Sequence, residues 1–242
     1  MIRFLYRHAW HLTLAIGPFS LGVLSRPALK TIKSELINRW AEASPGQLSP
    51  DNSPSDPQHY ARKSSQYEQL GEARKIVFLG DSRVEDAEWS ELLSSHDISN
   101  RGISGDTTTG VLLRLRTSIP RDISLCILQL GVNDLSKGCS VDFVLSKYDQ
   151  ILTDLLERVN ARVLVSAVIL AGDDRASLNP VISEFNRQLA LLVARRGAVW
   201  IDVNQSLCPN GILPAAYTND GIHLNGEGYR KFSTLLSHHL EK

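Results

Sequence analysis

Short apolar runs alternate with amphipathic segments from about residue 60 to the end of the chain. Continuous apolar runs are typical of strands buried on both faces of a sheet, whereas apolar positions three or four residues apart indicate helices. The pattern predicts five strands, at Lys75–Leu79, His96–Ile103, Leu125–Leu130, Arg162–Ile169 and Ala198–Val203. It predicts helices at Asp86–Ser95, Thr107–Ser118, Val141–Val159, Leu178–Arg196 and Glu227–Leu240. Such alternation produces βαβ units, so we expect an α/β fold, a parallel sheet with helices on both faces.

The first 43 residues have a different pattern. Arg3 and Arg7 precede the segment Ala9–Ser25, which contains no Asp, Glu, Lys or Arg. A basic start followed by an apolar stretch resembles a signal peptide or a signal anchor. However, Gly17 and Pro18 interrupt the stretch, which is shorter than the roughly 20 residues that span a bilayer well. No small-residue cleavage site follows it closely.

An amphipathic helix is predicted next, because apolar residues recur at helical spacing from Leu29 to Trp40. Residues 1–43 are therefore interpreted as a hydrophobic and amphipathic helical extension. We favour membrane association or export as its role, and the alternative is an extension that packs on the main domain of a cytoplasmic protein or on a partner. The pattern leaves open whether it is a signal peptide, a membrane anchor or docked helices.

Residues 44–59 are predicted to be a linker. The stretch Ser44–Gln58, SPGQLSPDNSPSDPQ, is rich in Pro, Ser and Asp, a composition typical of extended or disordered segments. We therefore place a domain boundary here and expect one domain over residues 60–242. A domain of about 180 residues can bury a sizeable core.

Charge and cysteine content exclude several classes of function. The chain has 26 basic and 26 acidic residues, so no overall field attracts it to nucleic acid. Its three cysteines form no CxxC motif or pairing pattern, which argues against a disulfide framework and against a zinc site. Nothing in the composition indicates a cofactor, and the oligomeric state is left open.

Polar clusters follow several predicted strands. The carboxyl ends of parallel strands meet at one edge of a sheet, where ligands bind, so clusters distant in sequence are expected to converge there. The clusters are Gly80-Asp81-Ser82, the glycine-containing segment Asn100–Thr108, Gly131-Val132-Asn133-Asp134 and the segment Asp220–Asn225.

These clusters contain the groups needed for nucleophilic catalysis. Ser82 could attack a carbonyl if a base takes its proton, and His223 is the best base available because imidazole titrates near neutral pH. Asp220, three residues earlier, could accept the Nδ1 proton and stabilise the imidazolium. An oxyanion could be bound by Ser82 N–H, Gly105 N–H and the side-chain amide of Asn133.

Other interpretations exist for each cluster. Ser82 could simply cap a helix, and the glycine-rich segment could bind a phosphate, although the lysine of a P-loop is missing. A metal site is the other alternative, but it would leave the serine and the asparagine without a role. Its ligands would be Asp81, Asp134, Asp220 and His223.

Together the four clusters, in this order and spacing, resemble the blocks of the SGNH or GDSL-type hydrolases. The resemblance covers roughly residues 73 to 242, and the segment Asn100–Leu115 is similar to bacterial esterases and to brain-type platelet-activating-factor acetylhydrolase catalytic subunits. It implies a flavodoxin-like, three-layer α/β/α fold with a five-stranded sheet. It also implies ester hydrolysis by Ser82, His223 and Asp220, with oxyanion donors from Ser82, Gly105 and Asn133, and no metal.

One position departs from the family motif. Arg83 follows the serine where the name of the motif has leucine. A cation beside the nucleophile could favour an anionic substrate. The interpretation we prefer is a solvated arginine at a helix start, paired with Glu85 or Asp86.

The sequence therefore predicts a serine esterase that acts through an acyl-enzyme. Asp81 and Asp134 are expected to support the loops through backbone hydrogen bonds. Because the loops that could cover a pocket are short, we expect short acyl groups, such as acetyl esters of a carbohydrate or small alcohol. A lysophospholipase or thioesterase for longer acyl chains is the alternative, and an inactive module that binds a carbohydrate or a partner is a more remote one.

Overall fold

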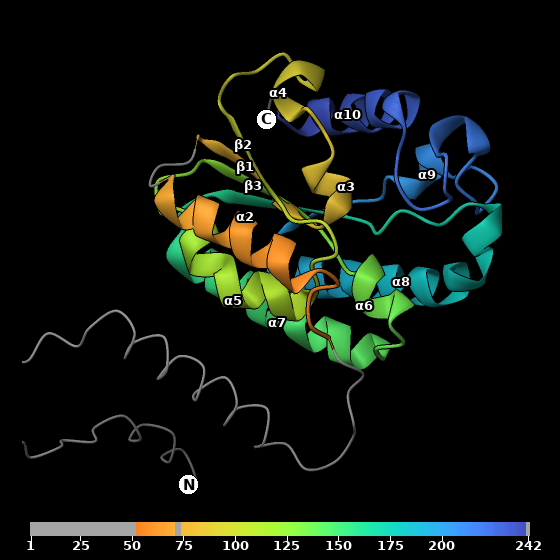
Figure 1. Cartoon of the computed structure of the whole chain (residues 1–242), viewed down its shortest axis with the longest axis horizontal. Helices are drawn as coiled ribbons and strands as arrows, with labels where there is room; N and C mark the ends of the chain where they lie inside the picture. The colour runs from red at the N-terminus through yellow and green to blue at the C-terminus, as the bar shows by residue number, and fades with distance from the viewer. Residues whose placement is uncertain (1–51, 71–73, 241–242) are drawn as a thin grey trace, which may run out of the picture. The chain divides into compact units, whose positions relative to one another are not determined.

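Five parallel strands form one sheet, in the order β2-β1-β3-β4-β5 (Figure 1). The computed structural model describes residues 52–70 and 74–240. The chain divides into two units, Met1–Leu48 and Ser49–Lys242, and the described residues lie in the second. Each predicted strand is found, although every one ends or begins a few residues differently. The strands are β1 (Ile76–Gly80), β2 (Ile98–Gly102), β3 (Leu125–Gln129), β4 (Arg162–Ser166) and β5 (Val199–Ile201).

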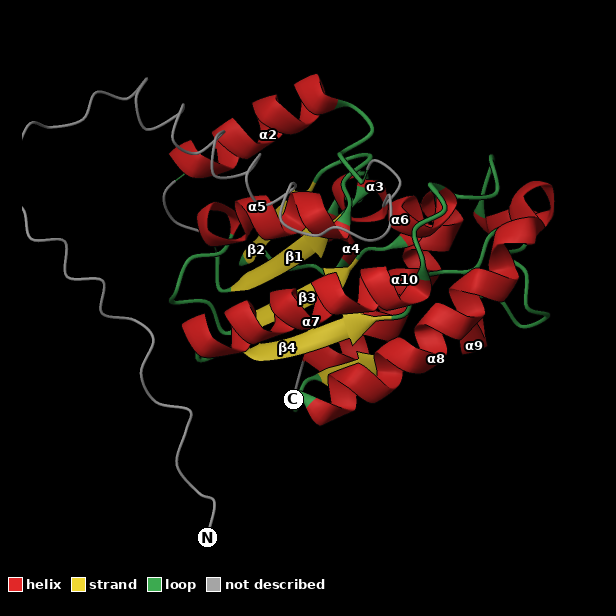
Figure 2. Ribbon diagram, turned by 90° about the horizontal axis from the view of Figure 1, so that it is seen from below, coloured by secondary structure: helices red, strands yellow, loops and turns green. Residues whose placement is uncertain are grey.

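Helices cover both faces of the sheet, which confirms the predicted three-layer α/β/α fold (Figures 1 and 2). One face carries α5 (Thr108–Ser118), α7 (Val141–Arg158) and α8 (Asn179–Arg195). The other carries α3 (Ser82–Glu85), α4 (Trp89–Leu92) and α10 (Gly226–Leu240). The short connecting helices are α6 (Val132–Ser136), α9 (Asn204–Leu207), η1 (Asp173–Leu178) and η2 (Ala215–Tyr217).

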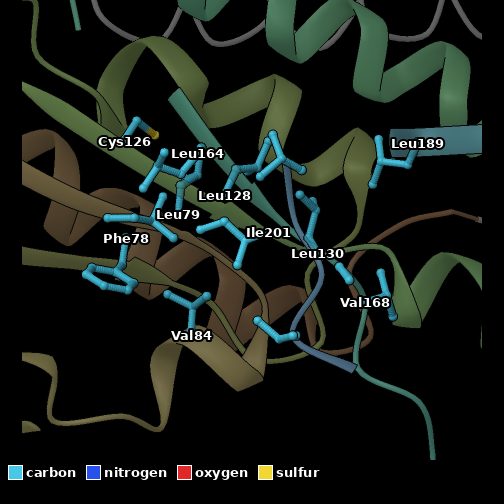
Figure 3. Packing of buried hydrophobic residues seen from close by; sticks show 14 of the residues in the cluster. Phe78, Leu79, Val84, Cys126, Leu128, Leu130, Leu164, Val168, Leu189 and Ile201 are labelled. Carbon is cyan, nitrogen blue, oxygen red and sulfur yellow. The ribbon is translucent and has the colours of Figure 1, made fainter. Parts of the chain in front are cut away.

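The core lies on both sides of the central strands. Phe78 and Leu79 are consecutive in β1, so their side chains project to opposite faces, and both are fully buried (Figure 3). On the face of α4 and α10, Phe78 stacks on Trp89 with ring centroids 4.1 Å apart. Trp89 also meets Tyr229 and Phe232 of α10 edge-on. This aromatic cluster holds α4 between the sheet and α10.

The helix predicted at Asp86–Ser95 is much shorter in the structure. Only Trp89–Leu92 of that stretch is helical, as α4, and a separate short helix, α3, ends just before Asp86. The Asn100 amide ends α3, because its Nδ2 donates to the carbonyl oxygens of Val84, Glu85 and Ala87 at 2.8, 3.1 and 3.1 Å. A continuing helix would need those carbonyls for its own hydrogen bonds.

Residues 52–59 also differ from the predicted linker. Helix α2 (Pro57–Gln69) begins inside it, and Asp56 caps this helix by accepting the N–H groups of Gln58 and His59. The composition indicated an extended segment, but Pro at the first helical position and Asp before it are also helix-start signals. Helix α2 packs against α5, where the hydroxyl of Tyr60 donates to Gly110 O at 2.7 Å. The segment 52–59 therefore belongs structurally to the domain.

The predicted helical extension, residues 1–43, and residues 44–51 of the predicted linker lie outside the described residues. Within residues 52–70 and 74–240, no helix combines the length and the apolar character needed to cross a bilayer.

Candidate active site

The predicted polar clusters lie at the edge of the sheet where the strands end. Ser82 follows β1 as the first residue of α3, and Asn133 follows β3 in α6. From β1 the chain goes to β2 on one side and then crosses to β3 on the other. Open α/β sheets bind ligands at such a switch point.

Gly80 allows α3 to begin directly at the end of β1. A Cβ atom at this position would lie 2.0 Å from the carbonyl oxygen of Gln129 and 2.5 Å from Val84 Cγ2. No side chain fits in that space, so the close approach of α3 to β3 requires glycine here. This approach places Ser82 at the switch point.

Ser82, His223 and Asp220 form a hydrogen-bonded chain. Ser82 Oγ lies 3.0 Å from Nε2 of His223, and Nδ1 of the same ring lies 2.6 Å from Oδ2 of Asp220. The other oxygen of Asp220 accepts the backbone N–H groups of Ile222 and His223 at 2.9 and 2.8 Å. Although desolvation opposes it, these hydrogen bonds hold the pKa of Asp220 well below its usual range. An ionised Asp220 favours the tautomer in which Nε2 is free to accept the serine proton.

The three expected oxyanion donors come from the segments that follow β1, β2 and β3. The N–H of Ser82 belongs to the first turn of α3, where helix N–H groups have no acceptor within the helix. Gly105 has φ +73°, a left-handed conformation that favours glycine. One N–H of the Asn133 amide donates to Asp106 O at 2.9 Å, which leaves its second N–H for another acceptor.

Asp81 and Asp134 are buried and accept hydrogen bonds from the backbone. Asp81 caps α3 by accepting the N–H of Arg83 at 3.0 Å, and burial raises its pKa to about 6 against the attraction of Arg83. Asp134 accepts the N–H and the hydroxyl of Thr108. Burial raises the pKa of Asp134 as well, and the hydrogen bonds from Thr108 and Asn52 oppose this.

The structure corrects both interpretations of Arg83. The residue is 1% exposed, so it is neither a solvated surface arginine nor a cation presented to a substrate. Its Nε donates to Ile222 O and its Nη1 to Ile169 O, both at 2.8 Å. Arg83 follows Ser82, and Ile222 precedes His223. The hydrogen bond between Arg83 and Ile222 therefore connects the segments that carry the serine and the histidine. The buried guanidinium of Arg83 thus supplies donors to two carbonyls that are distant in the sequence.

A second buried arginine was not identified from the sequence. Arg114 of α5 is 2% exposed and pairs with Asp106, with Nε 2.8 Å from Oδ2. Its Nη2 donates to Gly80 O at 3.1 Å and its Nη1 to Arg101 O at 2.9 Å. Arg114 thus joins the ends of β1 and β2 to the segment after Gly105. The sequence indicates this burial only through spacing, because Arg114 lies three residues after Val111 on the apolar side of the helix.

The metal site considered as an alternative has no counterpart in the described part of the chain. No group of three or more His, Cys, Asp or Glu side chains there is arranged to hold a metal ion. The three cysteines are buried and free.

Residues 78–231 match the model of the GDSL-like lipase/acylhydrolase family. The chain belongs to this family. The match covers well over half of the chain and confirms the resemblance derived from the four polar clusters.

Two kinds of protein are similar to this chain in sequence. The N-acylneuraminate cytidylyltransferase of Streptococcus agalactiae is 28% identical over 157 residues, which are 64% of this chain but only 36% of that protein. The chain thus spans about a third of the length of these relatives. The platelet-activating factor acetylhydrolase IB subunit alpha2 of Rattus norvegicus is 25% identical over 163 residues, 64% of this chain and 71% of that protein.

Solved structures share the fold at low identity. A protein from Streptococcus pneumonia described as a platelet activating factor has a TM-score of 0.72 at 22% identity, covering 87% of this chain and 99% of its own. The acetylxylan esterase of Geobacillus stearothermophilus has a TM-score of 0.59 at 16% identity, covering 70% of this chain and 94% of its own. These likenesses support the α/β/α fold.

Proposed function

We propose that this protein is a serine esterase that hydrolyses carboxylic esters through an acyl-enzyme at Ser82. The observation that carries the proposal is the 3.0 Å contact between Ser82 Oγ and Nε2 of His223, continued to Asp220 by the 2.6 Å contact at Nδ1. A hydroxyl in contact with an oriented imidazole is the arrangement that activates serine as a nucleophile.

In the proposed reaction, Ser82 Oγ bonds to the ester carbonyl carbon while His223 takes the hydroxyl proton. The tetrahedral oxyanion is held by Ser82 N–H, Gly105 N–H and the free N–H of Asn133. Its collapse breaks the bond to the alcohol, which leaves with the proton from His223. A water molecule then attacks the acyl-enzyme with His223 again as base, releasing the acid and restoring Ser82. Removing one oxyanion donor typically costs about 3–4 kcal/mol of activation free energy.

The charges around His223 support a neutral alcohol as leaving group. The leaving oxygen must meet Nε2 of His223, so the alcohol extends from that side of the site. A groove of about 530 Å³ lies between α4 and the start of α10, next to the residue that follows His223, and Leu224 and Tyr229 line it. Asp86, Glu88 and Glu91 line it as well, and their carboxylates would repel an anionic alcohol that extended into the groove. With Arg83 buried, the motif offers no compensating cation.

We propose short acyl groups, acetyl above all, on a carbohydrate or small alcohol. The segments that join β1, β2, β3 and β5 to the next helix have at most five residues, which leaves little chain at these strand ends to enclose a long acyl group. Two of the similar proteins, the acetylhydrolase and the acetylxylan esterase, are named for acetyl esters.

The serine assignment is tested with Ser82→Ala in the full chain. Hydrolysis of p-nitrophenyl acetate and labelling by a fluorophosphonate probe should both disappear, whereas Ser237→Ala, at a serine of α10, should keep both. A Ser82→Ala protein that folds and still hydrolyses the ester at the wild-type rate would refute the assignment.

The acyl-chain assignment is tested with p-nitrophenyl esters from acetyl to palmitoyl. We expect kcat/KM to be highest for acetyl and to fall steadily with chain length. A maximum at octanoyl or longer would overturn it and favour the lysophospholipase or thioesterase alternative.

A further inference from the structure

A short segment outside the family match contacts both loops that carry the expected oxyanion donors. This segment, residues 52–55, is called the strap below. It precedes α2 and lies well before residue 78, where the family match begins. Its hydrogen bonds reach the loop after β2 and the helix after β3.

The strap holds the Gly105 loop through two hydrogen bonds. The N–H of Ser55 donates to the carbonyl of Gly105 at 2.9 Å, which restrains the backbone rotation of that glycine. The hydroxyl of Thr107 donates to the carbonyl of Asn52 at 2.7 Å. The contact is close, because a Cβ atom on Gly105 would lie 2.9 Å from Ser55 Cβ.

The strap also holds the segment of Asn133. The side chain of Asn52 is 8% exposed, and its Nδ2 donates to Oδ1 of Asp134 at 2.9 Å. Lys137, at the end of α6, donates to the carbonyl of Ser53. One strap thus binds the neighbours of two donors that are 28 positions apart in the sequence (133 minus 105).

We propose that Asn52 is a positioning residue that, with the backbone of Ser55, sets the separation between the Gly105 N–H and the Asn133 amide. The inference rests on the proposed function, because it assigns the strap a role only if those groups bind an oxyanion. Such donors act when they lie about 2.7–3.1 Å from the oxyanion, and a misplacement of about 1 Å can cost a hundredfold in rate. The two loops are also linked directly, by Asn133 to Asp106 and by Thr108 to Asp134. The strap adds restraints at Gly105 O, the Thr107 hydroxyl and the Asp134 carboxylate.

The expected signature is kinetic. An oxyanion exists in the transition state and not in the bound ester, so a displaced donor lowers kcat and leaves KM nearly unchanged. Loss of stability alone would lower the amount of folded enzyme but not the rate of each active site.

The experiment compares full-length wild type, Asn52→Ala, Asn52→Asp and Asp56→Ala with p-nitrophenyl acetate. Active sites are counted by titration with a fluorophosphonate. We expect kcat per active site to fall about tenfold in Asn52→Ala. It should fall further in Asn52→Asp, because that variant places a second carboxylate against Asp134. Asp56→Ala removes the cap of α2 and leaves the strap contacts in place, so it should lower the melting temperature and keep kcat.

Three results would overturn the inference. Asn52→Ala with kcat within about twofold of wild type would show that the strap does not position the donors. An equal fall of kcat in Asp56→Ala would show that general loosening of the segment is responsible. A wild-type protein with neither hydrolysis nor labelling at Ser82 would refute the proposed function, and this inference with it. The first two results would refute this inference alone and leave the proposed function standing.

Discussion

Replacing Arg83 by leucine would restore the residue that gives the family motif its name, yet we expect it to damage this protein. Arg83 Nε and Nη1 donate to the carbonyls of Ile222 and Ile169 at 2.8 Å each. Leucine can donate to neither. Because Arg83 follows the proposed nucleophile and Ile222 precedes the proposed base, the variant removes a direct connection between them.

The cost can be worked from these contacts. Two hydrogen bonds from a charged donor contribute about 1.5–3 kcal/mol each, and the two carbonyls would be left buried and unpaired. Against this, the variant removes a buried charge whose desolvation lowers its own pKa and whose Nη2 has no hydrogen-bond partner in the described residues. We expect a net loss of about 2–4 kcal/mol in the free energy of unfolding. For a chain of this size, that corresponds to a fall of roughly 5–15 °C in melting temperature.

The assay combines urea unfolding with kinetics on p-nitrophenyl acetate at a temperature where the variant remains folded. We expect kcat to fall about tenfold, because a less restrained His223 spends less time in contact with Ser82 Oγ. Arg83→Lys should lie between wild type and Arg83→Leu, since an ammonium reaches one of the two carbonyls well. Arg230→Leu is the matched control, because that arginine is exposed on α10 and its pair with Glu227 contributes little.

The reasoning would be refuted if Arg83→Leu unfolded within about 0.5 kcal/mol of wild type and kept its kcat. That result would mean that the cost of burying the guanidinium cancels its hydrogen bonds. It would also mean that His223 stays in place without the hydrogen bond from Arg83 to Ile222.

Two further predictions concern the same edge of the sheet. Arg114→Met should cost about 3–5 kcal/mol at about pH 8, because it leaves Asp106 buried without its cation. Burial already raises the pKa of Asp106 to about 6, and the variant should raise it further. A carboxyl whose pKa is raised in the folded state contributes stability at low pH that is lost as pH rises through that pKa. The loss of unfolding free energy in Arg114→Met, measured by urea unfolding, should therefore be smaller at about pH 5 than at about pH 8. A loss that is independent of pH would contradict this. Asn133→Ala should lower kcat for p-nitrophenyl acetate by about 10²–10³ with little change in KM, and a loss confined to KM would point to substrate binding instead.

The sequence by itself determined the sheet and the convergence of the polar clusters. Strands buried on both faces must be apolar along their length, and the helices between them must be amphipathic, so both appear in the order of residues. Once the sheet is parallel, its geometry brings the segments of Ser82, Gly105 and Asn133, which follow β1, β2 and β3, to one edge. For this reason the candidate site could be predicted in outline. The position of His223, 22 positions beyond the end of β5, depends on the connection through α9 and η2.

Only the tertiary structure decided how that edge is held together. Arg83 finds its acceptor 139 positions away at Ile222, and Asn52 finds Asp134 82 positions away. Asn100 ends a helix that precedes it, and composition placed Asn52 in a linker. In each case a polar side chain satisfies a buried group that another part of the chain has left unpaired. Local patterns record which residues prefer burial or a given backbone conformation, but a buried hydrogen bond depends on which groups meet when the chain is folded.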